Sequence, residues 1–81
     1  MLLVVSACAV PHPNSVCDAA PAQRARRRVA TPSLVEAARQ RAGARTVHVI
    51  AHDAPVTKEY DTTRLSLQLD ARGQVVRVFC G

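Results

Sequence analysis

The chain has to build a hydrophobic core almost without aromatic side chains. It has 81 residues, of which one is Tyr, one is Phe and none is Trp. A domain of this size buries only about 60 % of the surface that its unfolded chain exposes. The core must therefore come from Val, Leu, Ile and Ala, and we expect a disulfide, a metal or a partner to add stability. The chain has little room for the deep pocket of an ordinary enzyme, and Ser, His and Asp show no catalytic spacing, so we expect no enzymatic activity.

Positive charge is concentrated in one short segment. The formal net charge is +5, and four of the eleven basic residues are Arg24, Arg26, Arg27 and Arg28. Such a run can attract phosphate groups or anionic lipid, although the simpler interpretation is a solvated, poorly ordered segment. Without the run the chain is close to neutral. Because stacking of bases needs aromatic side chains, the composition argues against a nucleic-acid partner.

The three cysteines, Cys8, Cys17 and Cys80, form no CxxC pair, which excludes a zinc ribbon or a thioredoxin-type site. The three histidines show no fixed spacing with them, so we expect neither a metal site nor a cofactor. The odd count indicates one disulfide pair and one cysteine with a separate role.

The N-terminal residues indicate a separate role for Cys8. Val5-Ser6-Ala7-Cys8 resembles the lipobox of bacterial lipoproteins, in which the signal peptide is cut before a cysteine that then carries the lipid. Residues 1–7 are too short for a complete signal and carry no positive charge, so they would be the remnant of a longer signal peptide. Residues 8–16 would be a flexible tether. The alternative is an accidental apolar run with a free thiol.

Lipidation at Cys8 would imply an exported protein, either periplasmic or anchored at the outer membrane. In that case Cys17 and Cys80 remain to pair with each other, because disulfides persist in an oxidising compartment.

A helix is expected at residues 32–42. Thr31 is a good N-cap, and Pro32 suits the first helical position, where no amide donor is needed. Gly43 suits the left-handed position that ends a helix. The expected apolar stripe of this helix consists of Leu34, Val35, Ala38 and Ala42.

Three segments show the alternation that is typical of β-strands, at residues 45–51, 64–70 and 74–80. In the third segment, Val76 and Val78 are expected on one face. Val75 and Phe79 are expected on the opposite face. A short turn that contains Gly73 joins the last two segments into a hairpin.

The connection between the first two strands, residues 52–63, is long. Pro55 fixes one φ angle, and the β-branched Val56 and Thr57 favour extended backbone. A loop of this length with extended backbone usually has a function. It also holds Lys58, the only lysine of the chain.

An ordered set of short motifs runs from residue 17 to residue 81. It consists of Cys17, Ala42-Gly43-Ala44, Val47-His48-Val49, Val56 to Tyr60, Arg64-Leu65, Leu69-Asp70, Gly73, Val75 and Cys80-Gly81. In this order the motifs resemble the potato inhibitor I family of serine protease inhibitors. They are still more similar to its microbial branch, the fungal elastase inhibitor-type peptidase inhibitors and their bacterial relatives.

The resemblance implies an α+β fold for a protease-inhibitor domain at residues 17–81. One helix would pack on a small mixed β-sheet, as in potato inhibitor I. The first two strands would be parallel, and a long exposed reactive loop would join them. The Cys-first, Cys-Gly-last pattern of the family also supports a disulfide between Cys17 and Cys80.

The resemblance also implies a function. The chain would be a monomeric serine protease inhibitor that presents its loop as a substrate mimic to trypsin-like or subtilisin-like proteases. Lys58–Glu59 aligns with the scissile bond. The other reactive-loop positions are Pro55, Val56, Thr57 and Tyr60. Arg64 would support the loop from beneath, and the expected brace is a pair between its guanidinium and the carboxylate of Glu59.

Two positions depart from the family pattern. His52-Asp53 stands where the loop usually begins with Pro-Gly, and Ser66 stands where potato-type members have a second supporting arginine. The missing arginine lowers the expected rigidity of the loop. One alternative function is a non-inhibitory, surface-tethered lipoprotein of the same fold. Another is a binder of anionic lipid or nucleic acid through the arginine run.

Overall fold

The computed structural model describes residues 16–55 and 59–81. These residues form a 3-10 helix, an α-helix and three strands, in the order η1 (Ala20–Ala25), α1 (Pro32–Ala42), β1 (Thr46–Ile50), β2 (Arg64–Leu69) and β3 (Val75–Cys80). The strands form one sheet in the order β1-β2-β3, in which β1 and β2 are parallel and β2 and β3 are antiparallel. The expected α+β fold with a mixed sheet is confirmed.

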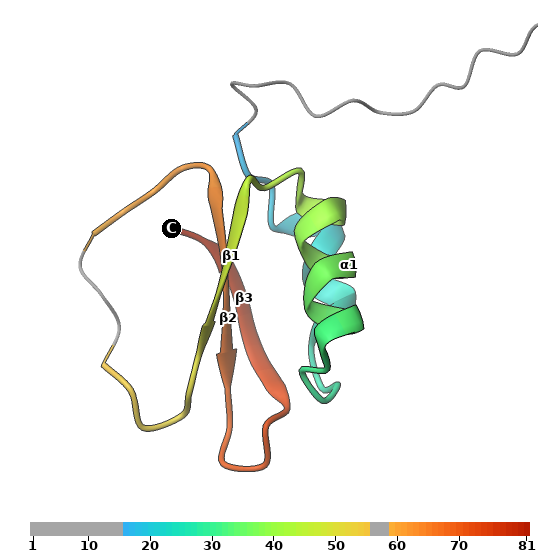
Figure 1. Cartoon of the computed structure of the whole chain (residues 1–81), viewed down its shortest axis with the longest axis vertical. Helices are drawn as coiled ribbons and strands as arrows, with labels where there is room; N and C mark the ends of the chain where they lie inside the picture. Colours follow the sequence, from blue (N-terminus) through green and yellow to red (C-terminus); the bar gives the residue numbers. More distant parts are fainter. Residues whose placement is uncertain (1–15, 56–58) are drawn as a thin grey trace, which may run out of the picture.

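The helices and the connection between β1 and β2 lie on opposite sides of the sheet. Figure 1 shows α1 against one face, with η1 beside it, and the described parts of the connection on the other side. After β3 the last described residue lies inside the wide curve that the β1–β2 connection makes in this view (Figure 1). This arrangement separates the packed side of the domain from the side that carries the loop.

Helix α1 has the bounds that its end signals predict. The N–H of Leu34 donates to the side-chain oxygen of Thr31 at 3.2 Å, and Pro32 occupies the first turn. At the other end Gly43 has a φ of 66°, and its N–H donates to the carbonyls of Arg39 and Gln40. Capping chemistry close in sequence therefore determines where the helix begins and ends.

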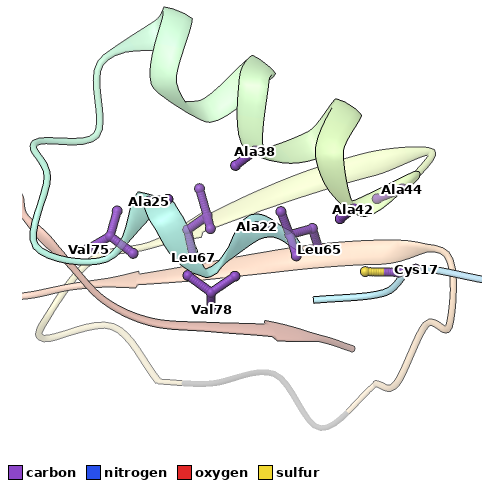
Figure 2. Close-up of a cluster of buried hydrophobic side chains, with 10 residues drawn as sticks. All are labelled: Cys17, Ala22, Ala25, Ala38, Ala42, Ala44, Leu65, Leu67, Val75 and Val78. Carbon is purple, nitrogen blue, oxygen red and sulfur yellow. The ribbon is translucent and has the colours of Figure 1, made fainter. Parts of the chain in front are cut away.

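The core combines alanines from the helices and from the α1–β1 connection with larger aliphatic residues from the strands (Figure 2). The cluster contains Ala22, Ala25, Ala38, Ala42, Ala44, Leu65, Leu67, Val75, Val78 and Cys17. Neither aromatic residue belongs to this cluster, as the composition predicts. Because alanine carries only a methyl group, the helices can lie close to the sheet, and the strand side chains fill the space between them.

The sequence periodicity does not predict η1. Its two buried residues, Ala22 and Ala25, are three positions apart. This spacing places them on one face of a 3-10 helix, which has three residues per turn. With Pro21 in its first turn, that spacing is the signal that could have revealed the element.

The prediction for the faces of β3 is wrong. Val75 and Val78 both lie in the core, whereas Val76 is 48 % exposed. The register with β2 shifts between Gln68 and Leu69, so that Val76 is an extra residue on β3. A bulge of this kind breaks simple alternation, because two residues on one strand oppose one on its partner.

The predicted disulfide is confirmed. Cys17 and Cys80 are joined, with their Cα atoms 5.8 Å apart, and the pair closes a sequence separation of 63 residues. Cys8 lies outside the described residues, as do residues 1–7 and most of the expected tether.

Candidate functional site

The candidate reactive loop leaves the sheet after β1 and returns to it at β2. On the outgoing side the N–H of Ala54 donates to the carbonyl of Ala51 at 3.1 Å, which closes a turn, and Pro55 is exposed. On the returning side Glu59 and Tyr60 are exposed. The loop residues Val56, Thr57 and Lys58 lie outside the described residues.

Arg64, the first residue of β2, supports the returning side of the loop. Its Nη2 donates to the main-chain carbonyl of Glu59 at 2.7 Å, and its Nε donates to the carbonyl of Gly81 at 3.0 Å. We expected the carboxylate of Glu59 as the partner, whereas the hydrogen bond described here goes to its carbonyl. A planar guanidinium suits this role because its donors are set at fixed angles and can bridge two acceptors.

Ser66 takes part in the same support by a different route from the missing second arginine. Its side chain is buried, at 1 % exposure, and its hydroxyl donates to the carbonyl of Gly81 at 2.7 Å. The N–H of Gly81 donates in turn to the carbonyl of Arg64 at 2.9 Å. The C-terminal glycine is therefore held at both its main-chain groups, and its carbonyl accepts from two side chains of β2.

Tyr60 packs directly on Gly81. A Cβ atom added to Gly81 would lie 3.0 Å from both Cδ1 and Cε1 of the Tyr60 ring. Gly81 also has a φ of 142°, which residues with a side chain rarely adopt. The close approach between the loop and the chain end therefore requires glycine at this position.

A turn at Asp61 shapes the returning side of the loop. Its Oδ1 accepts from the hydroxyl of Thr63 at 2.7 Å and from the N–H of Thr63 at 2.8 Å. These hydrogen bonds, the hydroxyl first and the amide second, lower the pKa of Asp61, and the positive charges of Arg64 and Arg45 act in the same direction. The carboxylate thus stabilises the turn that leads into β2.

The same stretch is tied to two other parts of the chain. The N–H of Cys17 donates to the carbonyl of Thr62 at 2.8 Å, and the N–H of Arg45 donates to the carbonyl of Thr63 at 2.8 Å. Through its disulfide, Cys17 also connects to Cys80, the residue before Gly81. Within the described residues, the returning side of the loop is therefore anchored to the N-terminal segment, to the start of β1 and to the chain end.

The described residues contain no group of three His, Cys, Asp or Glu side chains that could hold a metal ion. His48 lies half-buried on β1, opposite Ser66 of β2. In the part of the chain that the structure describes, no helix is long and apolar enough to cross a membrane.

Sequence reasoning identified Arg64 but missed the roles of Ser66, Thr62 and Gly81. The only sequence signal for Gly81 is its place directly after the paired cysteine. Nothing in the local pattern shows that its carbonyl would meet Arg64 and Ser66.

Comparison with known proteins agrees with the expected family. A comparison with curated protein sequences finds no match. Among solved structures, the chain is similar to "Structure of elastase inhibitor AFUEI (crystal form II)", with a TM-score of 0.59, 19 % identity, and coverage of 73 % of this chain and 81 % of that chain. At this identity the likeness shows the fold. The sequence profile of the peptidase inhibitor I78 family matches residues 17–81. The chain therefore belongs to the peptidase inhibitor I78 family and is a protease inhibitor, not an enzyme.

Proposed function

We propose that residues 52–63 form a reactive loop that enters the cleft of a serine protease as an extended substrate mimic, with Lys58–Glu59 as the scissile bond and the inhibitor acting as a monomer. Membership in the family supports protease inhibition. The observation that carries the loop mechanism is the hydrogen bond from Arg64 to the carbonyl of Glu59, because it holds the residue directly after the proposed bond.

The anchoring of the returning side supports slow turnover. In cleavage of an ordinary peptide, attack on the Lys58 carbonyl would release the amine of Glu59, and water would then hydrolyse the acyl-enzyme. Here Arg64 holds the carbonyl of Glu59, and Asp61 shapes the turn that follows. The released amine would stay beside the acyl group at a high effective concentration, so the bond would re-form.

The same contacts favour tight binding. A loop that is already held in place loses less conformational freedom when it enters a protease cleft. Because the described contacts are concentrated on the returning side, we expect Glu59 and Tyr60 to contribute most of this preorganisation.

The charge of Lys58 points to trypsin-like proteases as targets. A lysine in a specificity pocket needs a carboxylate at the base, as in trypsin. An apolar pocket would have to remove water from the ammonium group without replacing its hydrogen bonds. Subtilisin-like enzymes are the second class, because main-chain pairing along an extended segment provides much of the recognition in an open cleft.

An inhibition panel of trypsin, elastase and subtilisin tests this proposal. Elastase is included because the structurally similar protein is named as an elastase inhibitor. We expect Lys58→Ala to weaken trypsin inhibition by at least about thirtyfold, as for a central interface residue. Lys58→Met should shift the preference toward enzymes with apolar pockets. Arg41→Ala, an exposed arginine at the end of α1, is the control and should change nothing.

Two outcomes would contradict different parts of the proposal. Unchanged trypsin inhibition by Lys58→Ala would show that the reactive bond is placed wrongly. Better inhibition of elastase than of trypsin by the wild type would leave the loop in place but contradict the argument from the lysine charge.

We also propose that the gene product is exported and lipidated at Cys8, with residues 8–16 as a tether. The disulfide between Cys17 and Cys80 supports an oxidising compartment, and Ala9 resembles the residue that directs such lipoproteins to the outer membrane. Labelling with a radioactive fatty acid and membrane fractionation would test this, with Cys8→Ser as the unlabelled control. Recovery of an unlabelled wild type in the soluble cytosol would contradict it.

A further inference from the structure

The arginine segment, residues 24–28, is an ordered part of the fold. Its side chains at Arg24, Arg26, Arg27 and Arg28 are exposed, as the sequence predicts. Its backbone, however, is hydrogen-bonded along its length, which differs from the poorly ordered segment that charge alone predicts.

The segment is fastened to β3 by main-chain hydrogen bonds. The N–H of Arg27 donates to the carbonyl of Val75 at 2.7 Å, and the N–H of Val75 donates to the carbonyl of Arg28 at 2.9 Å. The next residue, Val29, forms a bridge with Gln74. Arg27 has a φ of 70°, so the chain turns sharply at this point. The arginines are therefore presented from a turn whose backbone is held in one conformation.

Few acidic residues lie close to the arginine segment in the sequence. Residues 19–35 contain no Asp or Glu. The ion pair that the described residues form joins Glu36 to Arg39 and involves none of the four arginines. Asp70 lies in the β2–β3 turn, where its carboxylate binds the amides of Arg72 and Gln74. Most of the positive charge of the segment is thus available to an external partner.

We propose that the arginine segment is a docking surface for an anionic membrane, with the guanidinium groups binding the phosphates of lipid headgroups. Planar guanidinium groups fit phosphate oxygens in pairs. The neighbouring Val29 is 54 % exposed and offers apolar surface beside the charges, as membrane-associating segments do. A nucleic acid is disfavoured because base stacking needs aromatic side chains, whereas Phe79 lies under Arg77 and Tyr60 packs on Gly81.

The location of the segment is compatible with simultaneous protease binding. The segment begins in the last turn of η1, which lies on the helix side of the sheet, and the loop lies on the other side (Figure 1). A membrane at the arginines would leave the loop accessible. This surface acts through charge and needs neither the reactive loop nor a lipid at Cys8, so it stands apart from the proposed function.

Vesicle co-sedimentation of the full, unlipidated chain tests the proposal. The probes are vesicles of phosphatidylcholine alone and vesicles of phosphatidylcholine and phosphatidylglycerol in a three-to-one ratio. The variant R24Q/R26Q/R28Q removes three charges and keeps Arg27, whose backbone conformation is unusual. Its matched control, R41Q/R45Q/R77Q, removes three exposed charges, from α1, from the residue before β1 and from β3.

We expect the wild type to bind only the vesicles that contain phosphatidylglycerol, and more weakly as salt is raised. Each basic residue at an anionic surface contributes about fivefold in affinity. The segment variant should therefore bind about a hundredfold more weakly, and the control variant should stay within about tenfold of the wild type. Both variants should keep the circular dichroism spectrum of the wild type.

The proposal is overturned if the wild type does not bind the anionic vesicles. It is also overturned if the two variants lose the same affinity, because binding then reports net charge alone. Tighter binding to a single-stranded oligonucleotide than to the vesicles would show that the partner is a nucleic acid. Protease inhibition by the segment variant is measured in parallel, so that a failure of this proposal is distinguished from a failure of the inhibitory one.

Discussion

Gly81 contacts three side chains at the returning side of the loop. Its carbonyl accepts from Nε of Arg64 and from the hydroxyl of Ser66, and the ring of Tyr60 lies against the glycine itself. Because Ser66 and Arg64 are both on β2, this strand holds Gly81 through two side-chain hydrogen bonds. The chain end and Arg64 then determine where Glu59 and Tyr60 lie. Ser66 thus contacts the same carbonyl as Arg64, from the position where potato-type members have a second arginine.

Replacing Arg64 tests this support directly. Arg64→Ala removes the donor to Glu59, and we expect trypsin to cleave the Lys58–Glu59 bond roughly ten to a hundred times faster, since hydrogen bonds from charged groups are worth about 1.5–3 kcal/mol. The preference among proteases should not change. Arg64→Lys should restore little, because one ammonium group lacks the fork that reaches both carbonyls. Mass spectrometry of the inhibitor during incubation with catalytic trypsin measures the cleavage, and an unchanged rate in Arg64→Ala would contradict the role.

Gly81→Ala should loosen the loop by a steric route. The new methyl group would meet the Tyr60 ring at 3.0 Å, and the backbone would be held at a φ of 142° that costs about 1–3 kcal/mol for alanine. We expect faster cleavage of the reactive bond. Gly43→Ala is the matched control, because Gly43 also has a positive φ but has no atom within 4 Å of the added Cβ. Gly43→Ala should lower the unfolding free energy without changing the rate at which trypsin cleaves the reactive bond. If trypsin cleaved Gly81→Ala and Gly43→Ala equally fast, the contact between Gly81 and Tyr60 would not be what holds the loop.

At the scale of elements, the described parts of the loop are supported unequally. The returning side is bound by Arg64, Cys17 and Arg45, and its own turn is closed by Asp61. On the outgoing side, the turn at Ala51 to Ala54 is closed by a local hydrogen bond. Under the proposed mechanism, these contacts would hold the new N-terminus in place after cleavage.

The turn at Asp61 should make stability depend on pH. Its pKa is lowered in the folded protein, first by the hydroxyl of Thr63 and then by the amide of Thr63. A lowered folded pKa means that the stabilisation is present above the unfolded pKa and is lost as pH falls through the folded pKa. We expect Asp61→Ala to be less stable than the wild type at neutral pH and the difference to vanish in strong acid.

Urea unfolding of both proteins across this pH range provides the measurement. Asp53→Ala serves as a control, because Asp53 is exposed on the outgoing side of the loop and should not change the pH profile. A constant difference between Asp61→Ala and the wild type at all pH values would show that the carboxylate charge is not what stabilises the turn.

At the scale of the whole molecule, the disulfide compensates for a core of small side chains. The bond between Cys17 and Cys80 closes a separation of 63 residues, which the loop-entropy relation converts to about 4 kcal/mol of stabilisation. That is a large fraction of the few kcal/mol that a core in so small a domain supplies. We expect the double variant Cys17→Ser/Cys80→Ser to lose about this amount of unfolding free energy. The matched control, Cys8→Ser, should lose none, and a comparable loss in the control would show that Cys8 takes part in the pairing.

Much of this architecture could be predicted from the sequence because its signals are local. The capping residues Thr31 and Gly43 define α1, the leucine alternation defines β2, and Gly73 marks the turn of the hairpin. Each of these signals depends on only a few neighbouring residues, so it can be recognised in the sequence without knowing the fold. The family resemblance, rather than periodicity, supplied the parallel pairing of β1 and β2.

The support of the site, in contrast, depends on contacts between residues far apart in the chain. Gly81 meets Arg64 across 17 positions and Ser66 across 15, and Cys17 reaches Thr62 from the other end of the domain. The bulge at Val76 and the attachment of the arginine segment to Val75 likewise follow from strand register and from packing against the sheet. Hydrogen-bond partners of this kind are chosen when the whole chain is packed, because the available donors and acceptors are set by the fold and not by neighbouring residues.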